Sequence, residues 1–173
     1  MMPVGAGDLP ADVSSAAGFA HFYRANLPTV YGYLVRLSGG DRSVAEDLCQ
    51  ETFLTLTAQL KRGDAAAADI RWLMTVARNK YLDHLRREQR RARHLRLLHP
   101  VDNGTEPDPD PTRSDVLEHL ERLEPLHRTV LMLRYVDGLP VESIARDLGR
   151  TLPATYSLLA RARTQLRQEG GTR

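Results

Sequence analysis

The sequence has one cysteine and one tryptophan, and aromatic residues make up only 6% of the chain. Cys49 has no second cysteine with which to form an internal disulfide, and no cluster of cysteine and histidine has the spacing of metal ligands. This composition fits the reducing cytosol, where disulfides are rare. We therefore expect a cytoplasmic protein that needs no metal or other cofactor.

Long apolar runs are also missing, since none approaches the roughly twenty residues that a membrane-spanning helix needs. The first residues, MMPVGAGDLPADVSSAAG, lack the arginine-led start and apolar middle of a signal peptide. We expect residues 1–17 to form a flexible tail and the protein to have no membrane span of its own. No strand-like alternation of apolar and polar residues is present either, so the predicted fold is all-α.

Charge is segregated along the chain, although the net charge is only +2. Residues 1–60 carry three basic and six acidic side chains, residues 61–99 carry eleven and four, and residues 100–173 carry ten and twelve. A local excess of cations indicates that one part of the chain binds an anionic partner, and it argues against non-specific binding by the whole surface.

The basic excess lies mainly in the segment 70–96, which has nine Arg or Lys residues against two acids. Its apolar residues recur at three- and four-residue steps and predict one buried helix face: Ile70, Leu73, Met74, Ala77, Tyr81 and Leu85. The cations, with Trp72 and Tyr81 as stacking surfaces and Asn79 as an amide that can contact a base edge, favour a nucleic-acid partner. A solvated basic helix with a core tryptophan is the alternative interpretation.

Two helices are expected before this segment. Residues 19–37 follow helical spacing, which Pro28 could kink or divide, and the helix ends near Ser38-Gly39-Gly40. A second helix over residues 44–60 places Cys49 on an apolar face, so we interpret this cysteine as a core residue and not as a reactive thiol. The opposite face is polar: Glu46, Asp47, Gln50 and Glu51. By itself, such an acidic face is usually only solvated.

The segment 100–111, PVDNGTEPDPDP, has four prolines, four acids and no apolar periodicity. We interpret residues 100–113 as a flexible linker between two small helical domains, predicted at residues 18–99 and 114–168. Residues 61–69, KRGDAAAAD, are predicted to form a shorter loop that leads into the basic helix.

The last part of the chain predicts a helix-turn-helix. Helical spacing marks one helix over residues 116–123 and a second over residues 125–134. A short helix follows the Asp137-Gly138 turn and ends at Gly149, and Thr151 can cap a longer helix after it. In a helix-turn-helix of this pattern, the second helix enters the major groove of DNA. A plain helical hairpin with no DNA role is the alternative interpretation.

Three stretches resemble, in order and spacing, the extracytoplasmic-function (ECF) sigma factors of bacterial RNA polymerase: AEDLCQETFLTL at 45–56, WLMTVARNKYLDHLRRE at 72–88 and LEPLHRTVLMLRYVDGLPVESIARDLGRT at 123–151. The resemblance covers about residues 19–167. It implies a protein that binds core RNA polymerase and directs promoter-specific transcription initiation in response to a stress or developmental signal. The implied partners are the beta-prime clamp helices and the beta subunit of core polymerase, promoter DNA and an anti-sigma factor. The resemblance implies no catalysis by this chain, because the polymerase performs the phosphoryl transfer.

Carried over residue by residue, the first-domain motifs imply two surfaces. The polar DxxQE face, which would dock on core polymerase, comprises Asp47, Gln50 and Glu51. The WLxxxARNxxxDxxRR pattern and the arginines after it would face the minus-ten promoter element, and they comprise Trp72, Arg78, Asn79, Lys80, Arg86, Arg87, Arg90 and Arg91. Within this pattern Trp72 could instead serve the core and Asp83 an internal pairing. The loop at 61–69 corresponds to the one that receives a flipped non-template base.

In the second domain the resemblance implies contacts with the minus-thirty-five element from Arg150, Thr151, Thr155, Tyr156, Ser157, Arg161 and Arg163. Many family members have GTVKSRLxRAR where this chain has ATYSLLARAR. Tyr156 and Leu158 thus stand at positions that are usually basic, so the chain departs from the family's usual pattern of contacts. Arg161 and Arg163 would contact the DNA backbone or support the helix.

Two other classes of protein remain as alternatives. A free-standing helix-turn-helix regulator, with residues 19–99 as a dimerisation or sensing domain, would bind duplex DNA specifically without polymerase. A helical metal-dependent enzyme would use His94, His99 and nearby acids, although the six histidines are scattered and lack ligand spacing. Stoichiometric metal in the purified protein would support the enzyme.

Overall fold

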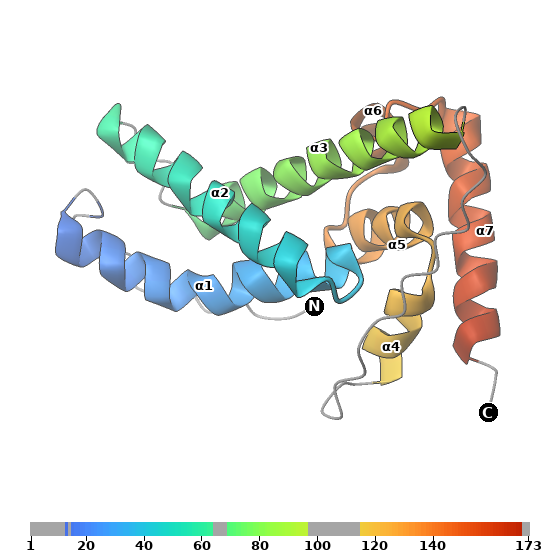
Figure 1. The fold of residues 1–173 in the computed structure, drawn as a ribbon, viewed down its shortest axis with the longest axis horizontal. Helices are drawn as coiled ribbons and strands as arrows, with labels where there is room; N and C mark the ends of the chain where they lie inside the picture. Colours follow the sequence, from blue (N-terminus) through green and yellow to red (C-terminus); the bar gives the residue numbers. More distant parts are fainter. Residues whose placement is uncertain (1–12, 14, 64–68, 97–114, 171–173) are drawn as a thin grey trace. The chain divides into compact units, whose positions relative to one another are not determined.

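The structure is a computed structural model that describes residues 13, 15–63, 69–96 and 115–170. All regular elements in these ranges are helical, which confirms the predicted all-α fold. In chain order they are α1 (Ala16–Ser38), α2 (Arg42–Lys61), α3 (Ile70–Arg96), α4 (Asp115–Arg122), α5 (Pro125–Leu131), the π-helical η2 (Met132–Val136), α6 (Val141–Asp147) and α7 (Leu152–Gly170) (Figure 1). No helix in the described part of the chain is long and apolar enough to cross a membrane.

The chain divides into two compact units. Of the described residues, unit 1 takes in 13, 15–34, 43–63 and 69–80, and unit 2 takes in 35–42, 81–96 and 115–170. The division falls within α1 and α3. The predicted linker lies outside the described residues, as do most of the predicted tail and of the loop before α3. The domain boundaries drawn at the linker therefore stay a prediction.

Helix α1 continues through Pro28 as one element of 23 residues, so the proline does not divide it. The helix ends where predicted, at Ser38, and Gly39 and Gly40 follow with φ angles of 71° and 85°. The Gly40 N–H donates to the Val35 carbonyl at 2.9 Å. The same carbonyl, one of the last of α1, also accepts the Ser38 hydroxyl at 3.2 Å. Glycine adopts the required positive φ at little steric cost.

In unit 1, α2 buries the face that its apolar spacing predicts: Ala45, Leu48, Cys49, Phe53 and Leu56. The Phe53 ring packs edge-on against Tyr23 of α1, with ring centroids 4.6 Å apart. Cys49 is buried, which confirms its interpretation as a core residue. Burial also raises the pKa of its thiol and so disfavours the reactive thiolate.

Helix α3 has the bounds that the sequence predicts, Ile70 to Arg96. Of its predicted inner face, Leu73, Ala77, Tyr81 and Leu85 are buried, whereas Ile70 and Met74 are only half-buried. Tyr81 is 3% exposed, and burial raises the pKa of its phenol. The prediction that Tyr81 offers a stacking surface is therefore wrong, because its ring is covered by protein.

In unit 2, one apolar cluster holds the C-terminal helices together; its buried members include Leu123, Val130, Leu133, Ile144, Leu158 and Leu159. The helix predicted to run to Arg134 instead ends at Leu131 and continues as η2. The Asp137 N–H donates to the carbonyl of Met132, five residues earlier, at 3.0 Å, as in a π-helix.

Unit 2 also buries a charged side chain that sequence analysis did not single out. Arg128, on α5, is 4% exposed. Its guanidinium donates to the carbonyls of Leu123, at 2.9 Å, and Leu37, at 3.4 Å. Burial lowers the pKa of this group, and these carbonyls partly offset the cost of removing its charge from water.

The turn between α6 and α7 depends on Gly149, which has a φ of 62°. The Gly149 N–H donates to Arg146 O at 3.1 Å and the Arg150 N–H to Ala145 O at 2.8 Å, the two bonds of a Schellman motif. The Thr155 N–H donates to Thr151 O at 3.0 Å at the start of α7. These bonds confirm the predicted short helix, glycine turn and longer helix.

Gly149→Ala is expected to lower the free energy of unfolding by about 1 kcal/mol, because an alanine Cβ is strained at positive φ. A Cβ at this position would meet no atom within 4 Å, so the loss would be conformational and not steric. Thermal or urea unfolding measures it. Gly149→Asn is the control, since asparagine tolerates this conformation better and should lose less. A Gly149→Ala variant as stable as the wild type would show that the turn does not need glycine.

Candidate nucleic-acid and polymerase interfaces

The first candidate surface is the outer face of α2, which we define as Asp47, Gln50, Glu51 and Leu54. Asp47 and Gln50 are exposed and Glu51 is half-buried. Leu54 lies one turn further along and is 67% exposed, the largest value among the exposed large apolar side chains that the structure describes. Sequence analysis missed Leu54, although its spacing of seven residues from Asp47 could have placed it on the same face.

Glu51 of this face forms an ion pair with Lys80 of α3, with Oε2 and Nζ 3.3 Å apart. Both residues were predicted to contact other molecules, yet in unit 1 they contact each other. The side chains are 44% and 33% exposed, so solvent screens the pair and it contributes at most about 1 kcal/mol to stability. The pair connects the acidic face of α2 with the basic helix α3.

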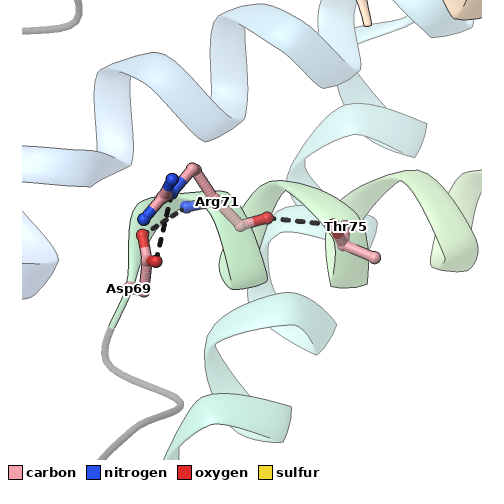
Figure 2. A network of polar contacts seen from close by, with 3 residues as sticks. All are labelled: Asp69, Arg71 and Thr75. Carbon is pink, nitrogen blue, oxygen red and sulfur yellow. Dashed lines mark hydrogen bonds and ion pairs between the residues drawn. The ribbon is translucent and has the colours of Figure 1, made fainter. Parts of the chain in front are cut away.

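The second candidate surface is α3, whose start is fixed by Asp69. The Asp69 carboxylate accepts the Arg71 backbone N–H at 2.8 Å and lies 3.2 Å from Arg71 Nε, and the Thr75 hydroxyl donates to Arg71 O at 2.9 Å (Figure 2). A carboxylate at this position is a good helix cap because it satisfies a free N–H and complements the helix dipole. Trp72 is half-buried, so part of this residue is accessible to a partner.

The other predicted minus-ten residues of α3 differ in their surroundings. Arg78 and Lys80 are half-buried, and the rest are exposed: Asn79, Arg86, Arg87, Arg90 and Arg91. Arg86 pairs with Asp83 at 2.6 Å and also donates to the Asp147 carbonyl, which confirms an internal pairing for Asp83. Arg91 pairs with Glu88 at 2.8 Å. The C-terminal half of α3 therefore presents a row of solvent-accessible cations suited to phosphate groups.

The third candidate surface is formed by α7 and the two residues before it. It exposes the predicted contacts that a DNA-binding surface requires: Arg150, Thr151, Tyr156, Ser157, Arg161 and Arg163. Thr155 is not among them, because its side chain is fully buried and its hydroxyl donates to Thr151 O at 3.0 Å. The prediction of a DNA contact by Thr155 is therefore wrong. Leu158 is 2% exposed in the apolar cluster, so of the two unusual residues only Tyr156 changes the surface.

The described residues include no group of three or more His, Cys, Asp or Glu side chains that could hold a metal ion. His94 is exposed on α3, and His99, the other ligand of the enzyme alternative, lies outside the described residues.

The chain matches two family models, Sigma-70 region 2 over residues 22–91 and Sigma-70, region 4 over residues 113–166. It is 32% identical to the RNA polymerase sigma factor CarQ of Myxococcus xanthus over 138 residues, which are 76% of each chain. It is also 32% identical to the ECF RNA polymerase sigma factor SigL of Mycobacterium tuberculosis over 148 residues, 80% of this chain and 81% of SigL. The match to the ECF RNA polymerase sigma factor BldN of Streptomyces coelicolor is 30% over 159 residues and spans 88% of this chain but only 60% of BldN.

Among solved structures, the fold is similar to that of the sigma factor RpoE from Bartonella quintana, solved in complex with the anti-sigma factor NepR. The TM-score is 0.55 at 22% identity, over 90% of this chain and 98% of that one. A helical chain that carries both sigma-70 region 2 and region 4 defines the class of protein. Within this class, the chain belongs to the ECF RNA polymerase sigma factors.

Proposed function

We propose that this protein binds core RNA polymerase and directs promoter-specific transcription initiation. The observation that carries the proposal is the presence of both sigma-70 regions in one chain, with an exposed surface in each that suits its role. The protein is a DNA-binding initiation factor and the polymerase performs the chemistry, so no catalytic residue is needed. It would act in the cytoplasm, where promoter DNA and polymerase meet.

In this proposal the outer face of α2 docks on the beta-prime clamp helices of core polymerase. The cations of α3, with Trp72 and Asn79, contact the minus-ten element. Opening a duplex costs a few kcal/mol for each extruded base, and phosphate contacts together with base stacking offset that cost. Helix α7 contacts the minus-thirty-five element through the major groove, and Arg150, Arg161 and Arg163 hold the phosphates beside it.

The beta subunit of polymerase and an anti-sigma factor complete the proposed partners. Regulated release from such an inhibitor would connect initiation to a stress or developmental signal.

Run-off transcription with core polymerase, with and without the full-length protein, tests the function. We expect specific transcripts from promoter templates only when the protein is added. Because the promoter is unknown, the templates are fragments of the native genome, and the start sites are mapped by sequencing the transcripts. Specific duplex binding by the protein alone, with no effect on transcription by core polymerase, would favour a free-standing regulator instead.

A further inference from the structure

The first half of α7 presents an apolar surface where a DNA-contacting helix commonly presents charge. We define the α7 apolar face as Leu152, Pro153, Tyr156 and Ala160. Leu152 and Tyr156 are 37% and 53% exposed, and the other two residues are also exposed. Residues four apart lie on one side of a helix, so Leu152, Tyr156 and Ala160 form a single stripe. No charged residue occurs on α7 before Arg161.

This stripe is not a poorly packed part of the core. The opposite side of α7 supplies the buried residues Thr155, Leu158, Leu159 and Ala162, which are at most 5% exposed. The Schellman turn at Gly149 sets the direction in which α7 leaves α6. The apolar face is therefore held outward on the helix that a helix-turn-helix inserts into the major groove.

The chemistry of the major groove limits what such a face can recognise. Guanine is recognised by Arg or Lys, adenine by Asn or Gln, and cytosine by Asp or Glu, whereas thymine presents a C5-methyl group that apolar side chains contact. The α7 apolar face has none of those charged or amide groups. Arg150 and Arg161, exposed at its two ends, supply the positive charge that complements the phosphates on either side of a groove.

We infer that the α7 apolar face recognises the C5-methyl groups of thymines in the upstream promoter element. This inference rests on the proposed function and deepens it, because it names the base chemistry that the second domain selects. Specificity then comes from buried methyl surface, with the hydroxyls of Thr151 and Ser157 as secondary contacts. A protein partner that covers Leu152 and Tyr156 is the competing occupant.

Replacing thymine with uracil distinguishes DNA from a protein partner as the occupant of the α7 apolar face. Uracil pairs as thymine does and lacks only the C5-methyl group. Core polymerase with the full-length protein first selects promoters from a library randomised in the upstream element. The selected duplex is then synthesised with deoxyuridine in place of each thymidine of that element, and the two duplexes compete for the holoenzyme. We expect thymines at one or two neighbouring positions, and a loss of about fourfold in affinity for each contacted methyl that is removed.

Variants of α7 test whether the preference for thymine over uracil comes from the α7 apolar face. Tyr156→Ala should reduce the thymine-to-uracil affinity ratio towards one, whereas Tyr156→Phe, which keeps the apolar ring, should retain it. Arg161→Ala is the matched control on the same helix, since loss of a phosphate contact should weaken binding to both duplexes equally. Tyr156 is largely exposed, so these changes should leave the thermal stability unchanged.

Each other outcome has a distinct meaning. Equal affinity for the thymine and uracil duplexes, or selected elements without thymine, would overturn this inference and leave the proposed function standing. A ratio unchanged by Tyr156→Ala would likewise overturn the assignment to this face and favour a protein occupant. Absence of any transcription that depends on both core polymerase and this protein would overturn the proposed function, and the inference with it.

Discussion

Replacing Asp47 and Leu54 together, as Asp47→Lys with Leu54→Ser, is expected to weaken binding to core polymerase by about tenfold to a hundredfold. The charge reversal removes an acidic contact, and the second change removes an apolar side chain that is 67% exposed. Covering an exposed leucine removes its apolar surface from water, and full burial of such a side chain contributes about 1.5–3 kcal/mol. The affinity of the labelled protein for core polymerase measures the effect.

The same double variant should unfold at nearly the wild-type temperature, because exposed substitutions usually change stability by less than about 0.5 kcal/mol. Glu118→Lys is the matched control, since it makes the same change in net charge at an exposed position on a different helix, α4. Should Glu118→Lys weaken binding as much as the double variant does, the effect would come from net charge and not from the outer face of α2.

The second large effect is expected from Arg87 and Arg90, changed together to alanine. Both are exposed on the C-terminal half of α3. We therefore expect their side chains to contact phosphates and their loss to leave the fold intact. Each lost contact should reduce the slope of log affinity against log salt by about 0.7 to 0.9. Promoter affinity should therefore fall for all sequences, while the preferred sequence stays the same. Holoenzyme binding to a promoter library at two or more salt concentrations measures both quantities.

Arg71→Ala supplies the comparison for this pair. Arg71 is on the same helix, but it is outside the residues predicted to contact the minus-ten element, and its side chain lies beside the carboxylate of Asp69 (Figure 2). We expect its loss to leave the salt slope nearly unchanged. If Arg87→Ala with Arg90→Ala changes the preferred sequence and leaves the slope as it was, these arginines contact bases and not phosphates.

The sequence by itself determined the features that depend on short stretches of chain. Apolar spacing predicted α3 from Ile70 to Arg96, and glycines predicted the ends of α1 and α6, because helix formation and capping depend on residues within a few positions of one another. The family motifs are local in the same sense. They indicated the family from three segments, without knowledge of how those segments pack.

Only the tertiary structure decided which side chains at the edges of each helix face are covered. Thr155 was predicted to contact DNA and Tyr81 to offer a stacking surface as well as to line the inner face of α3; both are buried, whereas Leu54 is apolar and exposed. Periodicity indicates the side of a helix on which a side chain lies. Whether that side chain is buried depends on how closely a neighbouring helix packs against it, and this distance is set by residues far away in the sequence. The ion pair of Glu51 with Lys80 has the same origin, since 29 positions separate the two residues and only helix packing brings their charges to 3.3 Å.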